Sequence, residues 1–327
     1  MENFYQDTVN SYGVSFQMDI KKGPNSTDFI MQTAEGPCTS SIFDVLPYVH
    51  LIYYDIHAHS LPGGTGEMPA LGRPVQLNYC IDGKTELMLD DETYIYMGPN
   101  DLCLSCQKSQ GDTYFPLKYY RGLALFFEDA FFSPENRALL DLLLPDINGL
   151  RLRYLQNQDT FLGVAEVRAK GILEKLWGLY KNPEIFYKRL YVLELLNCLI
   201  EESGCQEHSY ACYTRAQVEI AKKAEKILTQ DLSTHIPVRL IAEQFGVSET
   251  SLKNYFRGVY GKNISAYLRD LRMTTAETAL VSTDLSISEI ASQVGYTKQG
   301  KFAQVFKTTF GQSPLEYRRM KKLEALT

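Results

Sequence analysis

A short motif that occurs twice near the C-terminal end constrains the fold of this chain more than any other feature. The segments Ile241–Ser248 and Ile290–Thr297 align without gaps at an offset of 49 residues, with Ile, Ala, Gln and Gly at the same places. Each copy closes on Ser or Thr. An apolar helix that ends at glycine and restarts after a Ser or Thr N-cap is typical of two helices joined by a tight turn. The repeat therefore predicts two helix-turn-helix units.

Each copy of the motif continues into a second helix with an apolar stripe. Leu252 and Phe256 follow the first turn, and Phe302 and Phe306 follow the second at an offset of 50 residues, so the second turn is one residue longer. Residues at i and i+4 share one face of a helix. These side chains would hold each second helix to its core and leave the opposite face to project outward.

The outward faces of these two helices carry the residue types that read DNA. Asn and Gln pair with adenine, Lys pairs with guanine, Thr contacts a base edge, and Lys or Arg at the helix ends clamps phosphates. Any polar helix face has a similar composition, but two copies behind matching turns favour a DNA interface. The predicted DNA-binding residues are Thr250, Lys253, Asn254, Arg257, Lys298, Gln299, Lys301, Gln304 and Lys307.

Charge is distributed unevenly along the chain, whose net charge is −6. From Thr214 to the end there are 17 Lys and Arg against 11 Asp and Glu, whereas the first 213 residues carry 16 against 28. An acidic front part and a basic back part indicate that only the back part meets a polyanion such as double-stranded DNA.

Composition also bounds where the protein works. No run of about 18 apolar residues exists, which predicts no membrane span. The first ten residues are polar and acidic, unlike a secretory signal. Seven cysteines, an odd number, favour free thiols in a reducing compartment. We therefore expect a cytoplasmic protein that is associated with the nucleoid when bound to DNA.

The front part of the chain has a β pattern. Residues 1–40 show little periodicity and predict a loosely structured arm with one or two short strands. Residues 48–127 contain many short β-branched and aromatic runs between Gly, Pro and Asp turns, which favours a β-sandwich or a small barrel. Helices are then predicted from Ser133, where Pro134 takes the first turn, and over 164–180 and 183–202.

The back part of the chain is predicted to be all helical. Ser286 and Glu289 form a capping box at the start of one of these helices. The predicted helices cover residues 214–230, 236–245, 248–260, 263–281, 286–294, 297–310 and 314–323.

A longer pattern surrounds the second repeat. It consists of Ile287–Ala291, Val294–Tyr296, Phe302, Val305–Lys307, Phe310–Gly311 and Ser313–Arg318. With this pattern, residues 214–323 resemble the DNA-binding domain of AraC/XylS-type transcription regulators. The resemblance implies seven helices, with one long helix between the two helix-turn-helix units. It also implies that both recognition helices enter the major groove roughly one turn (~34 Å) apart.

The resemblance further implies roles by motif position. Base readers of the first unit would be Thr250, Lys253 and Asn254, and those of the second would be Gln299, Lys301 and Gln304. Members of the family often have Ser-Gln-Ser-Tyr-Phe where this chain has Lys298-Gln299-Gly300-Lys301-Phe302. Gly300 therefore puts the usual contact at that one position in doubt.

In this family the remaining half commonly senses a small molecule and dimerises, and residues 48–127 resemble its small cupin-like barrels. The expected fold class is α+β and multidomain, with an N-terminal cupin-like β-barrel followed by helices and a C-terminal all-α domain of seven helices. The expected domains are an arm and cupin-like ligand-sensing domain at 1–132, a helical dimerisation region at 133–202, a linker at 203–213 and the DNA-binding domain at 214–327.

The front part is rich in tyrosine, and aromatic rings with a polar group suit a pocket for a sugar or another ring-bearing ligand. The same residues also suit an ordinary core. The candidate ligand-binding residues are Tyr54, His57, Tyr79 and Tyr96, and the effector we expect is a small molecule such as a sugar or a siderophore.

Metal and redox chemistry find little support in the sequence. His57 and His59 begin a cupin-like metal motif, but Glu67 lies too far along the chain and no later histidine follows in the expected segment. Cys103 and Cys106 form a single CxxC pair without a second one. We therefore predict no metal site, no cofactor, no catalytic residues and no enzyme activity.

The leading hypothesis is thus a transcription regulator of AraC type that binds promoter or operator DNA under the control of an effector. We expect a homodimer, formed through the helix that carries Phe186, Leu190, Leu193, Asn197 and Ile200 at helical spacing. RNA polymerase is a further candidate partner. The alternatives are a cupin-type enzyme tethered to a DNA-binding domain and a DNA-binding protein that needs no ligand.

Overall fold

The computed structural model describes residues 18–61, 74–89, 92–106, 112–133, 144, 147–156, 159–201, 205–207 and 210–324. They form two compact units, an N-terminal unit over Met1–Cys212 and a C-terminal unit over Tyr213–Thr327. Among the described residues, no helix is long and apolar enough to cross a membrane.

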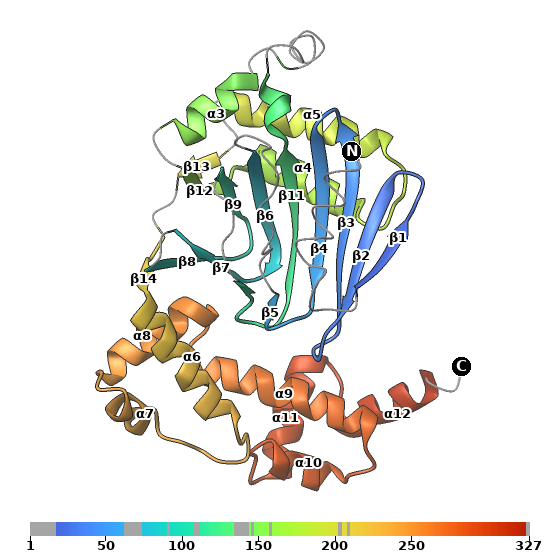
Figure 1. The fold of residues 1–327 in the computed structure, drawn as a ribbon. Helices are drawn as coiled ribbons and strands as arrows, with labels where there is room; N and C mark the ends of the chain where they lie inside the picture. The colour runs from blue at the N-terminus through green and yellow to red at the C-terminus, as the bar shows by residue number, and fades with distance from the viewer. Residues whose placement is uncertain are drawn as a thin grey trace. The chain divides into compact units, whose positions relative to one another are not determined.

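The N-terminal unit is built on a large antiparallel sheet of nine strands (Figure 1). In spatial order the strands are β1 (Met18–Lys22), β2 (Ser26–Gln32), β3 (Pro37–Leu46), β4 (Val49–Ile56), β11 (Tyr120–Phe127), β6 (Val75–Gly83), β9 (Asp101–Ser105), β12 (Thr160–Ala165) and β13 (Cys205–Glu207). The prediction of many short strands between residues 48 and 127 is confirmed, and they pair antiparallel.

Eight of the strands pair in a nested order. β4 pairs with β11, β5 (Ser60–Leu61) with β10 (Thr113–Tyr114), β6 with β9, and β7 (Thr85–Met88) with β8 (Thr93–Met97). Each pair thus encloses the next one, and β7 with β8 is the innermost pair. The chain folds back on itself as one long hairpin in this region.

The N-terminal unit was predicted to be a cupin-like β-barrel, but its large sheet does not close. Within the described residues the large sheet ends at β1 on one side and at β13 on the other, so the sheet is open. Its extension at one edge comes from β1, β2 and β3. The first two and the start of β3 lie in residues 1–40, where a loosely structured arm with one or two short strands was expected. Thr27, Phe29 and Met31 are buried alternately along β2, which is the period of a half-buried strand.

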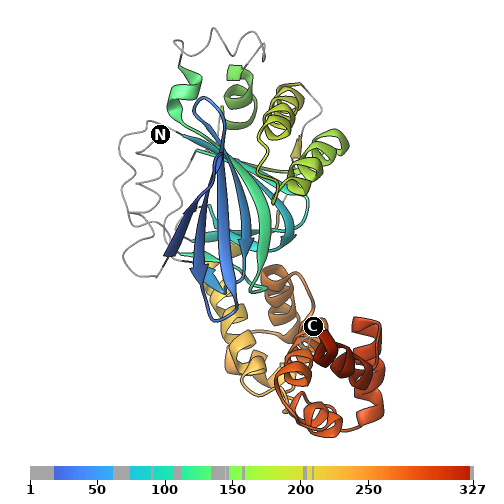
Figure 2. The ribbon, with the colours of Figure 1, turned by 90° about the vertical axis from the view of Figure 1, so that its right-hand side faces the viewer.

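Helices cover one face of the large sheet, as Figure 2 shows. They are α3 (Ile147–Leu155), α4 (Val167–Gly178) and α5 (Phe186–Ile200), preceded by a 3-10 turn at Asp129–Phe132. Leu51, Leu77 and Leu125 of the strands pack in one apolar core with Leu173 and Leu196 of the helices. Burial of these side chains is the main force that holds helices and sheet together.

Two expected helix boundaries differ from the structure. The helix expected over 164–180 begins at Val167, because residues 160–165 form β12 beside β9. The helix start expected at Ser133 falls, from Pro134 onward, outside the described residues.

Helix α5 buries a different stripe from the one expected to form a dimer seam. The buried side chains are Lys188, Val192, Leu195, Leu196, Cys198 and Leu199. By contrast, Phe186 is 62% exposed and Leu190 is 47% exposed. The expected seam therefore begins on the solvent side of the helix, where it does not pack against the sheet.

The side chain of Lys188, in the first turn of α5, is fully buried. Its ammonium group donates hydrogen bonds to the carbonyl oxygens of Asn182 and Glu184 and lies 4.2 Å from the centre of the Phe43 ring. Burial lowers the pKa of Lys188 to about 8. These contacts fasten the connection between α4 and α5 to the sheet.

The C-terminal unit contains the seven helices that the resemblance implies. They are α6 (Arg215–Thr229), α7 (Val238–Gln244), α8 (Glu249–Tyr260), α9 (Ile264–Ser282), α10 (Ile287–Gln293), α11 (Gln299–Phe310) and α12 (Pro314–Glu324). Helix α9 connects α6–α8 to α10–α12, and its 19 residues span ~28 Å at 1.5 Å per residue.

Each half of this unit has its own aromatic core. In the first half, the Phe256 ring of α8 packs edge-on against Tyr267 of α9, with centroids 5.3 Å apart. The Tyr267 hydroxyl donates a 2.9 Å hydrogen bond to the buried carboxylate of Glu225 in α6. In the second half, Phe302 and Phe306 of α11 pack with neighbouring helices. The predicted role of the apolar stripes is therefore confirmed.

Candidate nucleic-acid interface

The first helix-turn-helix unit consists of α7, a tight turn and α8. Gly246 has a φ of 66°, a left-handed conformation that favours glycine. The Val247 amide donates to the Ala242 carbonyl, and the Ser248 hydroxyl accepts from the Ser251 amide at 3.0 Å. Ser248 is thus the predicted N-cap, and its hydrogen bond sets the point at which α8 begins.

The second unit repeats this arrangement with α10 and α11. Gly295 has a φ of 80°, and the Tyr296 amide donates to the Ala291 carbonyl. Thr297 was expected to cap α11 by analogy with Ser248, and this expectation is wrong. The N-cap is Lys298, without a side-chain capping bond, because the extra residue in the turn moves Thr297 out of the N-cap position.

The capping box expected at the start of α10 is confirmed. The Ser286 hydroxyl accepts from the Glu289 amide at 3.2 Å, and the Glu289 carboxylate accepts from the Ser286 amide at 2.8 Å. These hydrogen bonds from Ser286 hold the pKa of Glu289 below its usual value. The box fixes the first turn of the helix that carries the second repeat.

Replacing Ser286 with alanine is expected to lower the free energy of unfolding of the C-terminal unit by ~1 kcal/mol, because an orphan amide loses its acceptor. Urea unfolding followed by circular dichroism would measure the change. The matched control is Ser288→Ala, two residues later on the exposed face of α10, which should stay within ~0.5 kcal/mol of the parent. A similar loss in both variants would assign the effect to the helix surface rather than to the cap.

All nine predicted DNA-binding side chains are exposed. Those of the first set lie on α8, opposite its buried side chains Leu252 and Phe256. Those of the second set lie on α11 and at its N-cap, opposite Phe302 and Phe306. The structure therefore gathers the nine residues into two polar faces, one on the second helix of each unit.

One predicted reader already has a partner in the free protein. The Lys253 ammonium lies 2.5 Å from the Glu249 carboxylate one turn earlier on α8. The Lys253 and Glu249 side chains are 53% and 42% exposed, so this pair contributes little to stability. Because the pair is weak, Lys253 can exchange Glu249 for a base or a phosphate at small cost.

Helix α12 fastens the second helix-turn-helix unit to α9 through two residues, Tyr317 and Arg318, to which the sequence alone assigns no role. Arg318 donates to the carbonyl oxygens of Leu280 at 3.1 Å and Leu285 at 2.7 Å, at the end of α9 and just beyond it. The Tyr317 hydroxyl donates to the Glu277 carboxylate on α9. Both residues stand in the Ser313–Arg318 motif, which is the signal that could have identified them.

The four candidate ligand residues do not converge. Tyr79 is buried among the side chains beneath the helices, and its hydroxyl donates to Asn100. Tyr54 packs against the apolar side chains on the other face of the sheet. The Tyr96 hydroxyl donates to Glu86 at 2.6 Å on the small β7–β8 hairpin.

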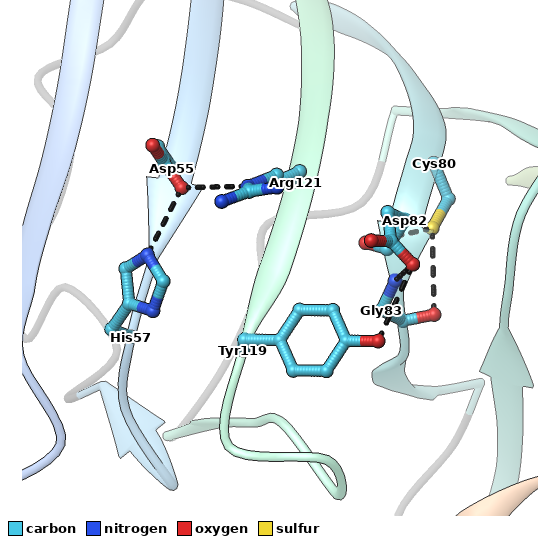
Figure 3. Close-up of polar contacts among 7 residues, drawn as sticks. All are labelled: Asp55, His57, Cys80, Asp82, Gly83, Tyr119 and Arg121. Atoms are coloured by element: carbon cyan, nitrogen blue, oxygen red, sulfur yellow. Dashed lines mark hydrogen bonds and ion pairs between the residues drawn. The ribbon is translucent and has the colours of Figure 1, made fainter. Parts of the chain in front are cut away.

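His57 belongs to a separate polar cluster at one end of the large sheet (Figure 3). Its Nε2 atom lies 3.2 Å from the Asp55 carboxylate, which also accepts from the Arg121 guanidinium at 3.1 Å. Nearby, the Tyr119 hydroxyl donates to Asp82 at 3.3 Å. The Asp55 carboxylate thus contacts both the His57 ring and the Arg121 guanidinium.

The described residues contain no group of three His, Cys, Asp or Glu side chains placed to hold a metal ion. His57 and His59 lie between β4 and β5 rather than within one strand, and the His59 ring packs edge-on against Tyr114. Cys103 is buried, whereas Cys106 is partly exposed and contacts Asp159. All seven cysteines are free thiols.

The C-terminal unit is similar in sequence to known helix-turn-helix proteins. Residues 241–320 match the family described as a helix-turn-helix domain. The transcriptional activator RhaR of Klebsiella pneumoniae is 32% identical over 123 residues, which cover 37% of this chain and 44% of that protein. The Msm operon regulatory protein of Streptococcus mutans is 32% identical over 141 residues, which cover 42% and 48%.

Among solved structures, the C-terminal domain of AraT, a response regulator from Geobacillus stearothermophilus, is 33% identical, with 31% of this chain and 84% of that chain covered and a TM-score of 0.30. The match to the curated relatives spans less than half of their length. The helix-turn-helix pair, its flanking motifs and the two curated relatives agree that the C-terminal unit is an AraC-type DNA-binding domain.

Proposed function

We propose that this protein is a sequence-specific DNA-binding regulator of transcription. The observation that carries the proposal is the pair of exposed polar faces on α8 and α11, each of which follows a tight turn at a glycine with positive φ. The unit that bears them is basic, with 17 Lys and Arg from Thr214 onward against 11 Asp and Glu. RhaR, a relative, is named as a transcriptional activator, which supports regulation as the outcome of binding.

We propose that the N-terminal unit senses a small-molecule effector, such as a sugar or a siderophore, and performs no catalysis. The nested pairing of β4–β11, β5–β10, β6–β9 and β7–β8 supports the sensing role, because it is the strand order expected of a cupin-like jelly roll. The ligand candidates Tyr54, His57, Tyr79 and Tyr96 remain predictions. An effector would act by binding two conformational states of the chain with different affinity.

We also propose a homodimer through α5 and a contact with RNA polymerase on the promoter. The exposed side chains of Phe186, Tyr187 and Leu190 support the dimer, because they form an apolar strip on the solvent side of the helix. Two copies would place four recognition helices on DNA. Sedimentation of the full chain over a concentration series tests the dimer.

The test of DNA binding uses the full chain and a duplex that it selects from a random library. We expect affinity for the selected duplex to fall steeply with salt, because bound Lys and Arg release counterions from DNA. Lys307→Ala, at the last turn of α11, should reduce the slope of log K against log salt by about 0.9 and weaken selected and random duplexes alike.

The matched control for that variant is Lys223→Ala, an exposed lysine of α6 that is paired with Glu219 outside both polar faces. It should leave the salt slope unchanged. Equal affinity of the full chain for selected and random DNA at physiological salt would overturn the proposed function.

A further inference from the structure

The two turn glycines stand at the same place in the repeat but have different surroundings. Gly246 has a φ of 66°, and a Cβ atom added to it would meet nothing within 4 Å. Gly295 has a φ of 80°, and its Cβ would lie 2.4 Å from the carbonyl oxygen of Leu232 and 2.9 Å from Nη2 of Arg272. With a backbone oxygen at that distance, a side chain fits only if the neighbouring backbone shifts. Gly295 is therefore a contact point as well as a turn.

Leu232 belongs to the other half of the unit, in the connection between α6 and α7. The Asp231 carboxylate accepts from the Ser233 amide at 2.9 Å and from the hydroxyls of Ser233 and Thr234, each at 2.6 Å. The Ser233 and Thr234 hydrogen bonds lower the pKa of Asp231 to about 2, so it is ionised at neutral pH. This turn holds the Leu232 carbonyl firmly against Gly295.

Arg272 lies in the middle of α9, the helix that joins the two halves. Its guanidinium group packs on Gly295, with the central carbon 3.0 Å from the added Cβ position. Burial raises the pKa of the neighbouring Tyr296, and the positive charge of Arg272 partly offsets this rise. Nε of Arg272 is buried and has no hydrogen-bond partner among the described residues. The contribution of this side chain at the contact is therefore packing against the turn, beside the Leu232 carbonyl.

A single helix between two bodies leaves them free to twist and bend about its axis. A second contact outside that helix removes this freedom. The contact of Gly295 with the Leu232 carbonyl is such a contact, and the Arg272 side chain of α9 packs on the same glycine. We propose that this contact fixes α8 and α11 in one relative position and so determines the spacing of the two DNA half-sites. This role, which rests on the proposed DNA-binding function, makes Gly295 and Arg272 specificity-determining positions although neither lies on a polar face.

The test is a spacing series on the full chain. The duplex selected by the parent protein is lengthened by one, two or five base pairs between the segments protected by α8 and α11. Because ~10 base pairs make one helical turn, each insertion rotates and shifts one half-site. For the parent, a single insertion is expected to weaken binding about tenfold, since one half-site loses its contacts.

Gly295→Ala should reduce this penalty to about threefold or less, because the added methyl group pushes the Leu232 turn away and frees α11. Gly246→Ala is the matched control. It imposes the same left-handed strain without a collision, and it should keep the parent's spacing requirement even if it weakens binding. Arg272→Ala removes the guanidinium group without strain and should also relax the requirement.

Two outcomes would overturn the inference: a parent protein that tolerates the insertions, or Gly295→Ala and Arg272→Ala variants that both keep the tenfold penalty. If Gly295→Ala does not fold, Arg272→Ala alone decides. Failure of the parent protein to select any duplex is a different result, because it removes the proposed function itself.

Discussion

Replacing Asn254 and Gln304 together with alanine is expected to weaken binding to the selected duplex by ~2–6 kcal/mol, because a bidentate amide–base pair contributes ~1–3 kcal/mol of discrimination. The two residues lie on different helices, α8 and α11, and both are exposed. Their separation predicts that the two single losses add. Fluorescence anisotropy titration of the full chain would measure them.

The pattern of losses across sequences distinguishes base reading from other causes. Loss of a base contact weakens the selected duplex while leaving random DNA almost unchanged, whereas loss of a phosphate contact weakens both. Gln230→Ala serves as the control, since Gln230 is exposed at the C-cap of α6, outside the polar faces. If the double variant bound the selected duplex as tightly as the parent, these two residues would not be readers.

The parts of the fold that follow from local chemistry were predictable. The turns at Gly246 and Gly295 need only a glycine with positive φ, and the capping box of Ser286 and Glu289 needs only residues three apart. The one local error concerns Thr297, which a single additional turn residue displaces from the N-cap. Local patterns also gave the exposed faces of α8 and α11, because those faces follow from helical periodicity.

The parts that depend on distant pairing were not predictable. Strands β1 to β3 join the sheet because β3 pairs with β4. One or two short strands were expected in residues 1–40, but no local pattern there predicts which strand they pair with. A sheet closes into a barrel only if its two edge strands pair with each other. The alternation of buried and exposed residues along each strand does not specify that pairing. Helix α5 shows the same limit: Phe186 and Val192 are both apolar, and only the packed sheet decides that Val192 is the buried one.

Gly295 and Arg272 illustrate a third kind of limit. The repeat makes Gly246 and Gly295 equivalent in sequence, yet only Gly295 touches the opposite half of the unit. The sequence thus predicted both polar faces without indicating the contact that we propose to fix their relative position. A repeated motif predicts what its copies share, and the differences between the copies depend on their neighbours in space.

Phe306→Ala is expected to lower the free energy of unfolding of the second half by ~3–5 kcal/mol, the range found when a buried phenylalanine is truncated. Phe306 is fully buried, and its ring packs against Phe302, Phe310 and Tyr317. The matched variant Phe256→Ala removes the equivalent ring from the first half. Thermal or urea unfolding of the full chain would show each loss.

The two variants should also differ in which DNA half-site they stop protecting. Because each aromatic core supports one reader, Phe306→Ala should remove the α11 footprint before the α8 footprint, and Phe256→Ala should do the reverse. Thr309→Ala is the control, since Thr309 is exposed on α11 and its hydroxyl bonds only to the Val305 carbonyl. If either core variant erased both footprints at once, the halves would unfold together, and the contact of Gly295 with Leu232 and Arg272 would join them in stability as well as in spacing.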